Sequence, residues 1–171
     1  MCIRDRRSVP EIKKINKFLR VVLIIEAHEQ KYTYSCIPSA IEMILKLLGK
    51  VDISFYDLQN NWGNKSDGSF GDFNGKTIRG LTFERKFAVP RSSNFPTEEL
   101  FRVIDEELAS DRYVIISLPV KNRWHMYVIY TKTDDDYHAF SKSGKKTIFL
   151  DNLKPIIYKI QGTDILIYKT Q

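Results

Sequence analysis

The side chains best suited to covalent chemistry in this sequence are Cys36 and His125, which lie far apart along the chain. A thiolate attacks a carbonyl carbon, and an imidazole holds the ion pair and protonates the leaving amine. An internal cysteine with a histidine far downstream is therefore a candidate pair for cleaving an acyl bond. The other two histidines, His28 and His138, have charged neighbours in the sequence and are predicted to be exposed.

Two further residues would complete such a site. Gln30 lies six residues before Cys36, close enough for its side-chain NH2 to reach the space above the sulfur and donate to an oxyanion. Asp151 ends a short apolar run and is the candidate for orienting His125. Asn152 is the alternative, because an amide oxygen also accepts a hydrogen bond from imidazole. The predicted catalytic residues are Cys36, His125, Asp151 and Gln30.

The segment after Cys36 has the pattern of a helix that begins at this residue. Pro38 suits the first turn, because its missing N–H would have no partner there, and Gly49 stands where a left-handed cap is expected. Between them lies an apolar stripe at spacings of three and four residues, formed by Ile41, Ile44, Leu45 and Leu48. Because a helix N-terminus favours an anion, this placement predicts a lowered pKa for the Cys36 thiol.

This pattern resembles that of the papain-like cysteine peptidases, and within them the bacterial double-glycine-leader (bacteriocin-processing) peptidases and their stand-alone relatives. In that group a Gln precedes the nucleophile in the motif Gln-x5-Cys-Gly-Pro-small-small. Here Gln30, Cys36, Pro38, Ser39 and Ala40 match the motif, and Ile37 replaces the usual Gly. The likeness continues through residues 113–119, His125 and Asp151, and it spans about residues 19–158.

The resemblance implies a papain-like fold and a peptidase that uses neither a metal ion nor an organic cofactor. Its weakest point is the residue that orients the histidine. In the relatives an Asp or Asn follows the His at a shorter distance, which falls here on Ser141 and Lys142. Asp151 lies 26 residues after His125, beyond one extra hairpin, and is the expected replacement.

The order of the predicted elements is that of an α+β protein, with an N-terminal helical half that carries the nucleophile and a C-terminal antiparallel sheet. Helices are predicted over 8–17, 36–48, 54–62, 76–87 and 97–109. Strands are predicted over 18–25, 113–118, 126–131, 137–140, 147–150, 156–160 and 165–169. Residues 63–75, rich in Gly, Asn, Ser and Asp, are predicted to form a long surface loop.

The length of 171 residues indicates one domain with a sizeable core. Residues 1–7 resemble the translated remnant of a sequencing adaptor, so the predicted domain covers 8–171. Two cysteines, Cys2 and Cys36, are too few for a disulfide framework and favour a reducing, cytoplasmic compartment. The apolar run over 18–25 is interrupted by Arg20 and is too short to cross a bilayer, so no transmembrane segment is expected.

The net charge of +6 is concentrated at the N-terminal end, where residues 1–20 contain seven basic and two acidic side chains. Such a segment would suit nucleic acid or an acidic surface. No Gly-rich aromatic motif and no zinc-ligand spacing supports nucleic-acid binding, so none is expected. The expected partner is a peptide or protein substrate.

The same residues leave two other functions open. An acyl transferase would use the same Cys36 and His125 chemistry and differ only in the nucleophile that resolves the acyl-enzyme. A non-catalytic module of the same fold would bind a peptide, and both Ile37 and the displaced Asp151 motivate this alternative. The pKa of the Cys36 thiol discriminates between an enzyme, for which it is depressed, and a binding module, for which it is ordinary.

Overall fold

The structure, a computed structural model, describes residues 8–120 and 123–170. Its helices are α1 (Val9–Ala27), α2 (Cys36–Leu47), α3 (Asp57–Trp62), α4 (Thr97–Ala109) and α5 (Leu153–Lys159), with a 3-10 turn η1 (Phe70–Asp72). Its strands are β1 (Thr77–Ile78), β2 (Leu81–Lys86), β3 (Val114–Val120), β4 (Arg123–Thr133), β5 (Asp136–Ser143), β6 (Lys146–Leu150) and β7 (Ile165–Thr170). The predicted α+β class is confirmed.

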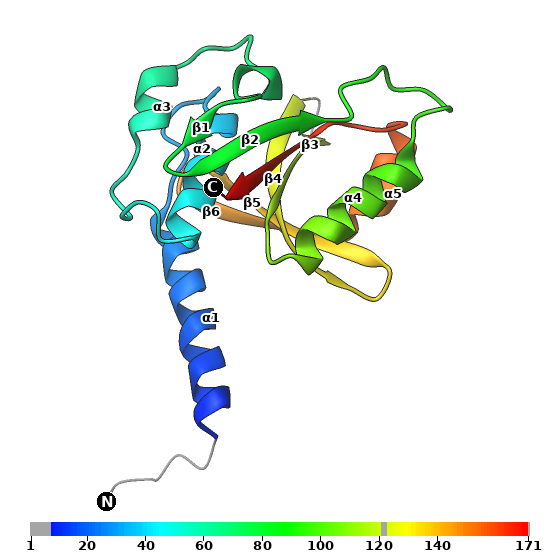
Figure 1. The fold of residues 1–171 in the computed structure, drawn as a ribbon. Coiled ribbons are helices and arrows are strands. Elements are labelled where there is room, and N and C mark those ends of the chain that lie inside the picture. The colour runs from blue at the N-terminus through cyan, green and yellow to red at the C-terminus, as the bar shows by residue number, and fades with distance from the viewer. Residues whose placement is uncertain (1–7, 121–122, 171) are drawn as a thin grey trace, which may run out of the picture.

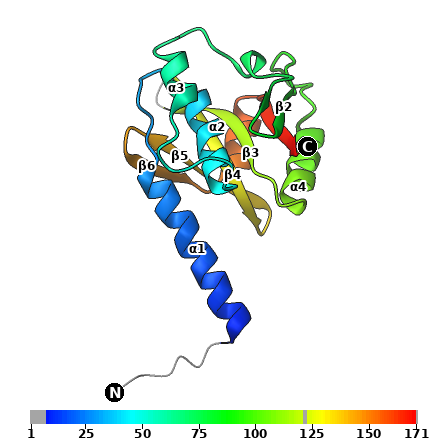
Figure 2. The ribbon, with the colours of Figure 1, turned by 60° about the vertical axis from the view of Figure 1, so that its left-hand side comes forward.

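The strands form one antiparallel sheet in the order β1-β2-β7-β3-β4-β5-β6. Helices cover both faces, with α2 on one side and α4 and α5 on the other (Figures 1 and 2). Successive strand residues alternate between the two faces, so Ile115 packs in the core beside α2 and Ile116 packs beside α4. The protein therefore has two hydrophobic cores, one on each side of the sheet.

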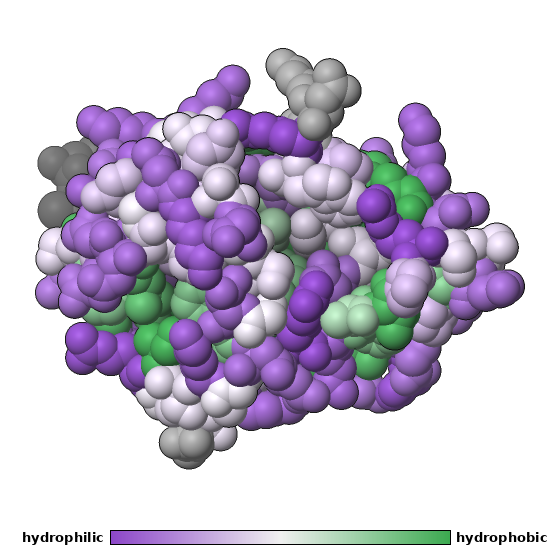
Figure 3. Space-filling model, turned by 90° about the horizontal axis from the view of Figure 1, so that it is seen from above, coloured by the Kyte–Doolittle hydropathy of each residue, from purple (hydrophilic) through white to green (hydrophobic). Residues whose placement is uncertain are grey.

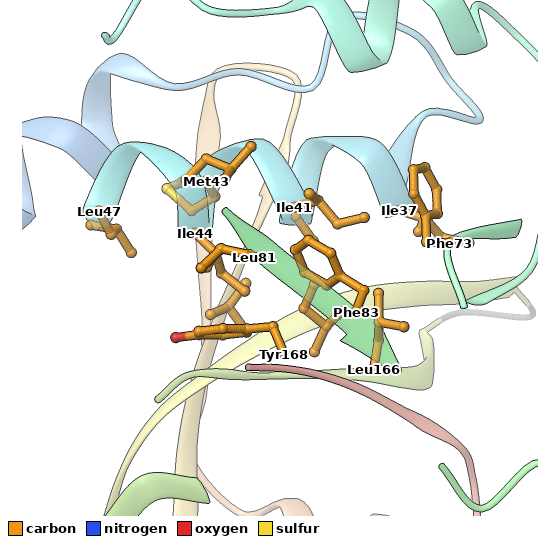
Figure 4. Close-up of a cluster of buried hydrophobic side chains, with 14 of the residues drawn as sticks. Ile37, Ile41, Met43, Ile44, Leu47, Phe73, Leu81, Phe83, Leu166 and Tyr168 are labelled. Atoms are coloured by element: carbon orange, nitrogen blue, oxygen red, sulfur yellow. The ribbon is translucent and has the colours of Figure 1, made fainter. Parts of the chain in front are cut away.

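The core beside α2 fixes the helix that begins at Cys36. Every residue of α2 from Ile37 to Leu47 is buried. Figure 4 shows its side chains Ile37, Ile41 and Ile44 above β2 and β7. The strands contribute Leu81, Phe83, Leu166 and Tyr168 to this core. The apolar stripe predicted from the sequence is thus confirmed as the packing face of α2.

Eight other predicted segments, two helices, five strands and one loop, form as expected. The helix over 97–109 is α4, whose Leu100 and Ile104 are fully buried under the sheet. The strands over 113–118, 126–131, 137–140, 147–150 and 165–169 correspond to β3, β4, β5, β6 and β7. The loop over 63–75 forms and contains only the short turn η1. The helix over 8–17 is the first part of α1.

The prediction of a strand over 18–25 is wrong, because α1 continues through these residues to Ala27. The helix starts in a capping box, in which Ser8 Oγ accepts from Glu11 N and the Glu11 carboxylate accepts from Ser8 N. No glycine or proline occurs between Pro10 and Ala27. Ile24 and Ile25 then pack beside α2, which holds the C-terminal end of the helix.

The prediction of a helix over 76–87 is also wrong, because these residues form the hairpin of β1 and β2. Arg79 and Gly80 both have positive φ, 50° and 84°, as a two-residue hairpin turn requires. Phe83 is fully buried in the sheet. The pairing of β2 with β7 over six positions therefore outweighs the helical spacing of the apolar residues in this segment, which forms a strand.

Two helix starts differ from expectation because residues distant in sequence cap them. The strand predicted over 156–160 is part of α5, whose Leu153 and Lys154 N–H groups donate to Asp136 of β5. The capping box predicted for Ser54 and Asp57 is not formed, since the Ser54 side chain is paired with Asp52. The α3 N–H groups of Leu58 and Gln59 donate instead to Glu42 of α2.

The carboxyl group of Glu42 is fully buried between α2 and α3. Its Oε2 accepts the two hydrogen bonds from α3, and its Oε1 has no partner among the described residues. Burial raises the pKa of Glu42 to about 7, although the hydrogen bonds from Gln59 and Leu58 oppose the change. The buried carboxyl group of Glu42 thus links α2, the helix that begins at Cys36, to α3.

His28, predicted to be exposed, is buried at the start of the loop that leads to Cys36. Lys46 Nζ donates to His28 Nδ1 at 2.9 Å, and His28 Nε2 lies 2.9 Å from the Ser39 carbonyl oxygen, which can only accept. The ring is therefore neutral, with its proton on Nε2. Burial and the Lys46 charge lower the pKa of His28 to about 3.

In the described part of the chain, no helix is both long and apolar enough to cross a membrane.

We expect His28 to make the protein less stable in acid. An unfolded His28 binds a proton below its ordinary pKa of 6.5, whereas the folded ring stays neutral to about 3. The free energy of unfolding should therefore fall with decreasing pH across this window, by up to about 1.4 kcal/mol per pH unit. Urea unfolding at several pH values measures this slope. His28→Gln should flatten it, and an equally steep slope in His28→Gln would assign the effect to other groups.

Candidate active site

Cys36 is the first residue of α2 and is half-buried at the N-terminus of the helix. The N–H groups of Ile37 and of Cys36 itself approach the sulfur and favour its thiolate. The loop before Cys36 is fixed by Gln59, a fully buried residue of α3 that sequence reasoning did not single out. Gln59 Oε1 accepts from Lys31 N at 2.7 Å and from the Ser35 hydroxyl at 2.8 Å.

His125 lies in β4, opposite Leu118 of β3, and is 6% exposed. Its Nε2 is 3.2 Å from the backbone carbonyl oxygen of Lys142 in β5. Because a carbonyl oxygen only accepts, this contact requires the proton on Nε2 and leaves Nδ1 with a free lone pair. The ring also meets Tyr127 edge-on, with centroids 5.9 Å apart. His125 is thus held as a neutral imidazole whose Nδ1 can take up a proton.

Cys36 and His125 line the same pocket, of about 240 Å³, where the start of α2 meets the start of β4. Their side chains come from opposite halves of the chain, as the sequence predicts. No hydrogen bond joins the two side chains in the part of the chain that the structure describes. The structure therefore brings the candidate nucleophile and base to one cavity without pairing them.

Gln30 also lies beside Cys36, since both line a second, very small cavity behind the pocket. Its backbone N–H donates to the carbonyl of Gly144 at 2.9 Å, which ties the loop to the turn between β5 and β6. The side-chain Nε2 donates to the carbonyls of Tyr32 and Thr33, at 3.0 and 3.1 Å. Gln30 is therefore near the sulfur, but its NH2 group is engaged within its own loop.

The prediction that Asp151 orients His125 is wrong. Asp151 Oδ1 lies 2.7 Å from Nδ1 of His138, whose Nε2 contacts the hydroxyl of Thr133. The register explains this, because β5 and β6 pair Ala139 with Leu150, and the next position sets Asp151 beside His138. His138 is partly exposed, in line with its predicted surface position.

Asn152, the alternative orienting residue, stands at the N-cap position of α5 and makes no side-chain cap bond there. The position that contacts His125 is Lys142, where the spacing of the related peptidases falls. A lysine side chain has no acceptor for an imidazole N–H, and the contact uses the main-chain carbonyl instead. A backbone acceptor has no sequence signature, so only the strand pairing could reveal it.

The pKa shifts oppose the prediction of a thiolate at rest. Burial raises the pKa of the Cys36 thiol, against the lowering effects of the Ile37 and Cys36 N–H groups and of the Arg123 charge. Burial also lowers the pKa of His125, the Lys142 carbonyl partly offsets this, and Arg123 lowers it further. The resting pair is therefore a neutral thiol and a neutral imidazole. The expected lowering by the helix N-terminus is present but is smaller than the effect of burial.

The pocket around Cys36 continues into a larger cavity of about 750 Å³ between the loops on either side of β2. Ile37, Gly68, Trp124 and Met126 line both spaces. Figure 3 shows this face, where apolar residues lie among hydrophilic side chains. A Cβ at Gly68 would lie 1.9 Å from the Trp62 ring, so only glycine allows the loop to pack on this wall.

The rim of the larger cavity carries positive charge. Arg91 lies over the ring of Trp124, 4.6 Å from its centroid, and Arg85 pairs with Asp164 at 2.8 Å. An open, largely apolar cleft with a few polar groups at its edge is suited to an extended chain rather than to an enclosed small molecule. Among the described residues, no group of three or more His, Cys, Asp or Glu side chains is arranged to hold a metal ion.

Comparisons of the chain with protein-family models, with curated proteins and with solved structures gave no match.

We expect the Cys36 thiol to react slowly with iodoacetamide at neutral pH, because burial raises its pKa above the ordinary 9.0. The labelling rate, followed by intact mass in a Cys2→Ser background, should rise only in the alkaline range. His125→Ala should leave the titration close to that of the parent, since no hydrogen bond joins the two groups. Rapid labelling in mild acid that His125→Ala abolishes would instead show a thiolate–imidazolium pair at rest.

Proposed function

We propose that the protein is a papain-like cysteine peptidase that hydrolyses a peptide or isopeptide bond through Cys36 and His125. The observation that carries this proposal is the shared pocket, which is lined by Cys36 at the start of α2 and by His125 of β4. Support also comes from the Lys142 carbonyl, which fixes the tautomer of His125 that is basic at Nδ1. The cleft beside the pocket would hold the substrate chain.

The reaction would start from the neutral pair. As the Cys36 sulfur attacks the carbonyl carbon, Nδ1 of His125 takes up the thiol proton and the carbonyl oxygen becomes an oxyanion. Collapse of the tetrahedral intermediate breaks the C–N bond, and His125 returns its proton to the leaving amine. Water then attacks the thioester with His125 as base, which releases the acid and restores the thiol.

The oxyanion would be stabilised by backbone N–H groups at the start of α2 and by Gln30. The amides of Cys36 and Ile37 approach the sulfur and are suited to a neighbouring anion. The Gln30 NH2 group would have to exchange one of its two loop carbonyls for the oxyanion. This rearrangement involves the side chain alone, because the Gln30 backbone is held by Gly144.

The proposal assigns no carboxylate to His125. An Asp or Glu beside the histidine would stabilise the imidazolium that forms during attack. The Lys142 carbonyl supplies orientation and a partial negative charge only. We therefore expect slower turnover than in enzymes with a complete triad. The thiol must stay reduced, which favours a reducing compartment such as the cytoplasm.

A second candidate is a peptide-binding module of the same fold that has no catalytic activity. The raised pKa of Cys36 and the missing carboxylate at His125 favour it. Ile37 also fills space beside the nucleophile and lines both cavities. An acyl transferase is the closest variant of the enzyme, in which an amine replaces water in the last step.

Turnover of a fluorogenic peptide library should depend on Cys36 and His125. We expect Cys36→Ala to abolish hydrolysis and His125→Ala to lower kcat/KM by about a thousandfold, because both groups act in one step. Intact mass after a quench in acid should show an acyl-enzyme in the parent and none in Cys36→Ala. Peptide binding by the parent and by Cys36→Ala with equal affinity, without cleavage, would favour the module.

The role of the carboxyl group can be tested separately. Asp151→Asn should leave kcat/KM within about twofold of the parent, because Asp151 contacts His138 and lies apart from His125. His138→Gln is the matched control, since it removes the other half of the same surface pair. A large loss of turnover in Asp151→Asn with no loss in His138→Gln would restore Asp151 as the orienting residue.

Gln30→Ala should lower kcat by about a hundredfold or more while leaving the rate of Cys36 alkylation unchanged. The reason is that the amide acts on the oxyanion, which is absent from the alkylation reaction. Circular dichroism checks that the loop fold survives. Full turnover in Gln30→Ala would remove Gln30 from the mechanism and leave the helix amides as the donors.

A further inference from the structure

The N-terminal part of α1 extends away from the rest of the protein (Figures 1 and 2). Of the residues in this helix, only Ile24 and Ile25 are buried. They lie at its C-terminal end, where the helix packs beside α2. Of the preceding residues from Val9 to Leu23, Val21 is partly buried against this core and none is fully buried, so most of the surface of this segment is available to a partner.

The two sides of the extended segment differ in chemistry. At 100° per residue, its apolar side chains other than Val21 fall on one half of the helix surface. These are Val9, Ile12, Ile15, Phe18, Leu19, Val22 and Leu23. The basic side chains fall on the other half, and they are Lys13, Lys14, Lys17 and Arg20. The segment is therefore a basic amphipathic helix.

The apolar half is strongly exposed. Phe18 is 66% exposed and Leu23 is 69% exposed, which is unusual for large apolar side chains that stand together. The exposed surface continues onto the body of the protein at Ile53, in the loop after α2, which is 57% exposed. A shallow pocket lined by Leu19, Leu23 and Ile53 joins the two. An apolar surface of this extent, rimmed by charge, marks a contact site.

We propose that α1 docks on an anionic lipid surface, with its apolar half at the boundary between headgroups and acyl chains and its basic half among the headgroups. Segregated Lys and Arg opposite Phe and Leu are the features of a helix that lies in a membrane interface. The four basic residues face lipid phosphates in this arrangement, and long basic side chains reach outward while their stems stay apolar.

Charge favours lipid over a second copy of the chain. The only acidic residues of α1 are Glu11 and Glu26, which stand near its two ends. Two copies that paired through their apolar halves would leave eight basic side chains on the outer sides of the pair, without acidic partners along the helix. An anionic surface neutralises the same charges. The proposal is independent of the chemistry at Cys36.

The extended segment of α1 lies apart from the cleft. The loops that line the larger cavity lie at the end of the molecule opposite to the start of α1 (Figure 1). Contact along the extended segment would therefore use a part of the molecule other than the loops that line the cleft.

Co-sedimentation of the full chain with vesicles tests the proposal. We expect binding to phosphatidylcholine vesicles that contain phosphatidylglycerol, weaker binding to phosphatidylcholine alone, and a decrease in binding as salt screens the charges. Phe18→Ser combined with Leu23→Ser should weaken binding about tenfold or more, because both remove apolar area from the inserted side. Circular dichroism checks that the body of these variants is folded.

Two charge variants identify the part of the chain responsible. Lys13→Gln with Lys17→Gln should weaken binding to the anionic vesicles. Lys145→Gln with Lys146→Gln, which removes equal charge from the exposed end of the β5–β6 hairpin, should leave it unchanged. A third variant with Arg4, Arg6 and Arg7 changed to Gln should keep most of the binding, because the proposal rests on α1.

Three results would overturn the proposal. One is the absence of binding to anionic vesicles. Another is binding that the Phe18 and Leu23 changes do not affect, as expected for a purely electrostatic contact that nucleic acid would satisfy equally. The third is a dimer in sedimentation velocity without lipid that Phe18→Ser with Leu23→Ser dissociates, since a second copy would then cover the apolar side.

Discussion

The burial of α2 against the sheet is the constraint on which the rest of the arrangement depends. The helix is covered along its whole length, by strands on one side and by α1 and α3 on the others. Its N-terminus cannot shift without disturbing the contacts of Ile41 and Ile44 with the core. Cys36 is therefore placed by packing that is remote from it. The sheet places His125 in the same way, through its pairing with β3 and β5.

The surroundings of the two groups decide which chemistry they can support. Burial favours the neutral form of both groups, and among the described residues the charge of Arg123 is the only one that affects the pKa of both. The Lys142 carbonyl defines a tautomer without adding a full negative charge. In such a site the imidazole is oriented by a hydrogen bond, but the thiol is not already ionised before a substrate binds. Proton transfer would accompany attack rather than precede it.

Sequence reasoning succeeded where local signals and packing agree. Pro38, the apolar stripe and Gly49 all indicate the helix that α2 forms, and Val- and Ile-rich runs predict most of the sheet. It failed where a distant residue decides the structure. The start of α5 depends on Asp136, and β2 exists because β7 pairs with it.

The same distinction applies to the site. The types of Cys36 and His125 and the order of the flanking segments predicted a candidate pair, and both residues line one pocket. The partner of His125 was not predictable, because it is the main-chain carbonyl of Lys142, and the pairing of β5 with β6 sets Asp151 beside His138. Gln59 was missed for a related reason, since a buried glutamine in a short helix has no pattern that reveals its contacts.

The link between α2 and α3 has a consequence for the motions of the site. Glu42 of α2 caps α3, and Gln59 of α3 holds the loop that runs into Cys36. A helix of six residues has little stability by itself, so α3 persists through these contacts. The three segments should therefore open and close together as one cooperative unit. The pKa of Glu42 is near 7, so the charge between α2 and α3 changes close to neutral pH. The rigidity of the loop that carries Gln30 is therefore coupled to a proton on Glu42, which is buried and inaccessible to a substrate.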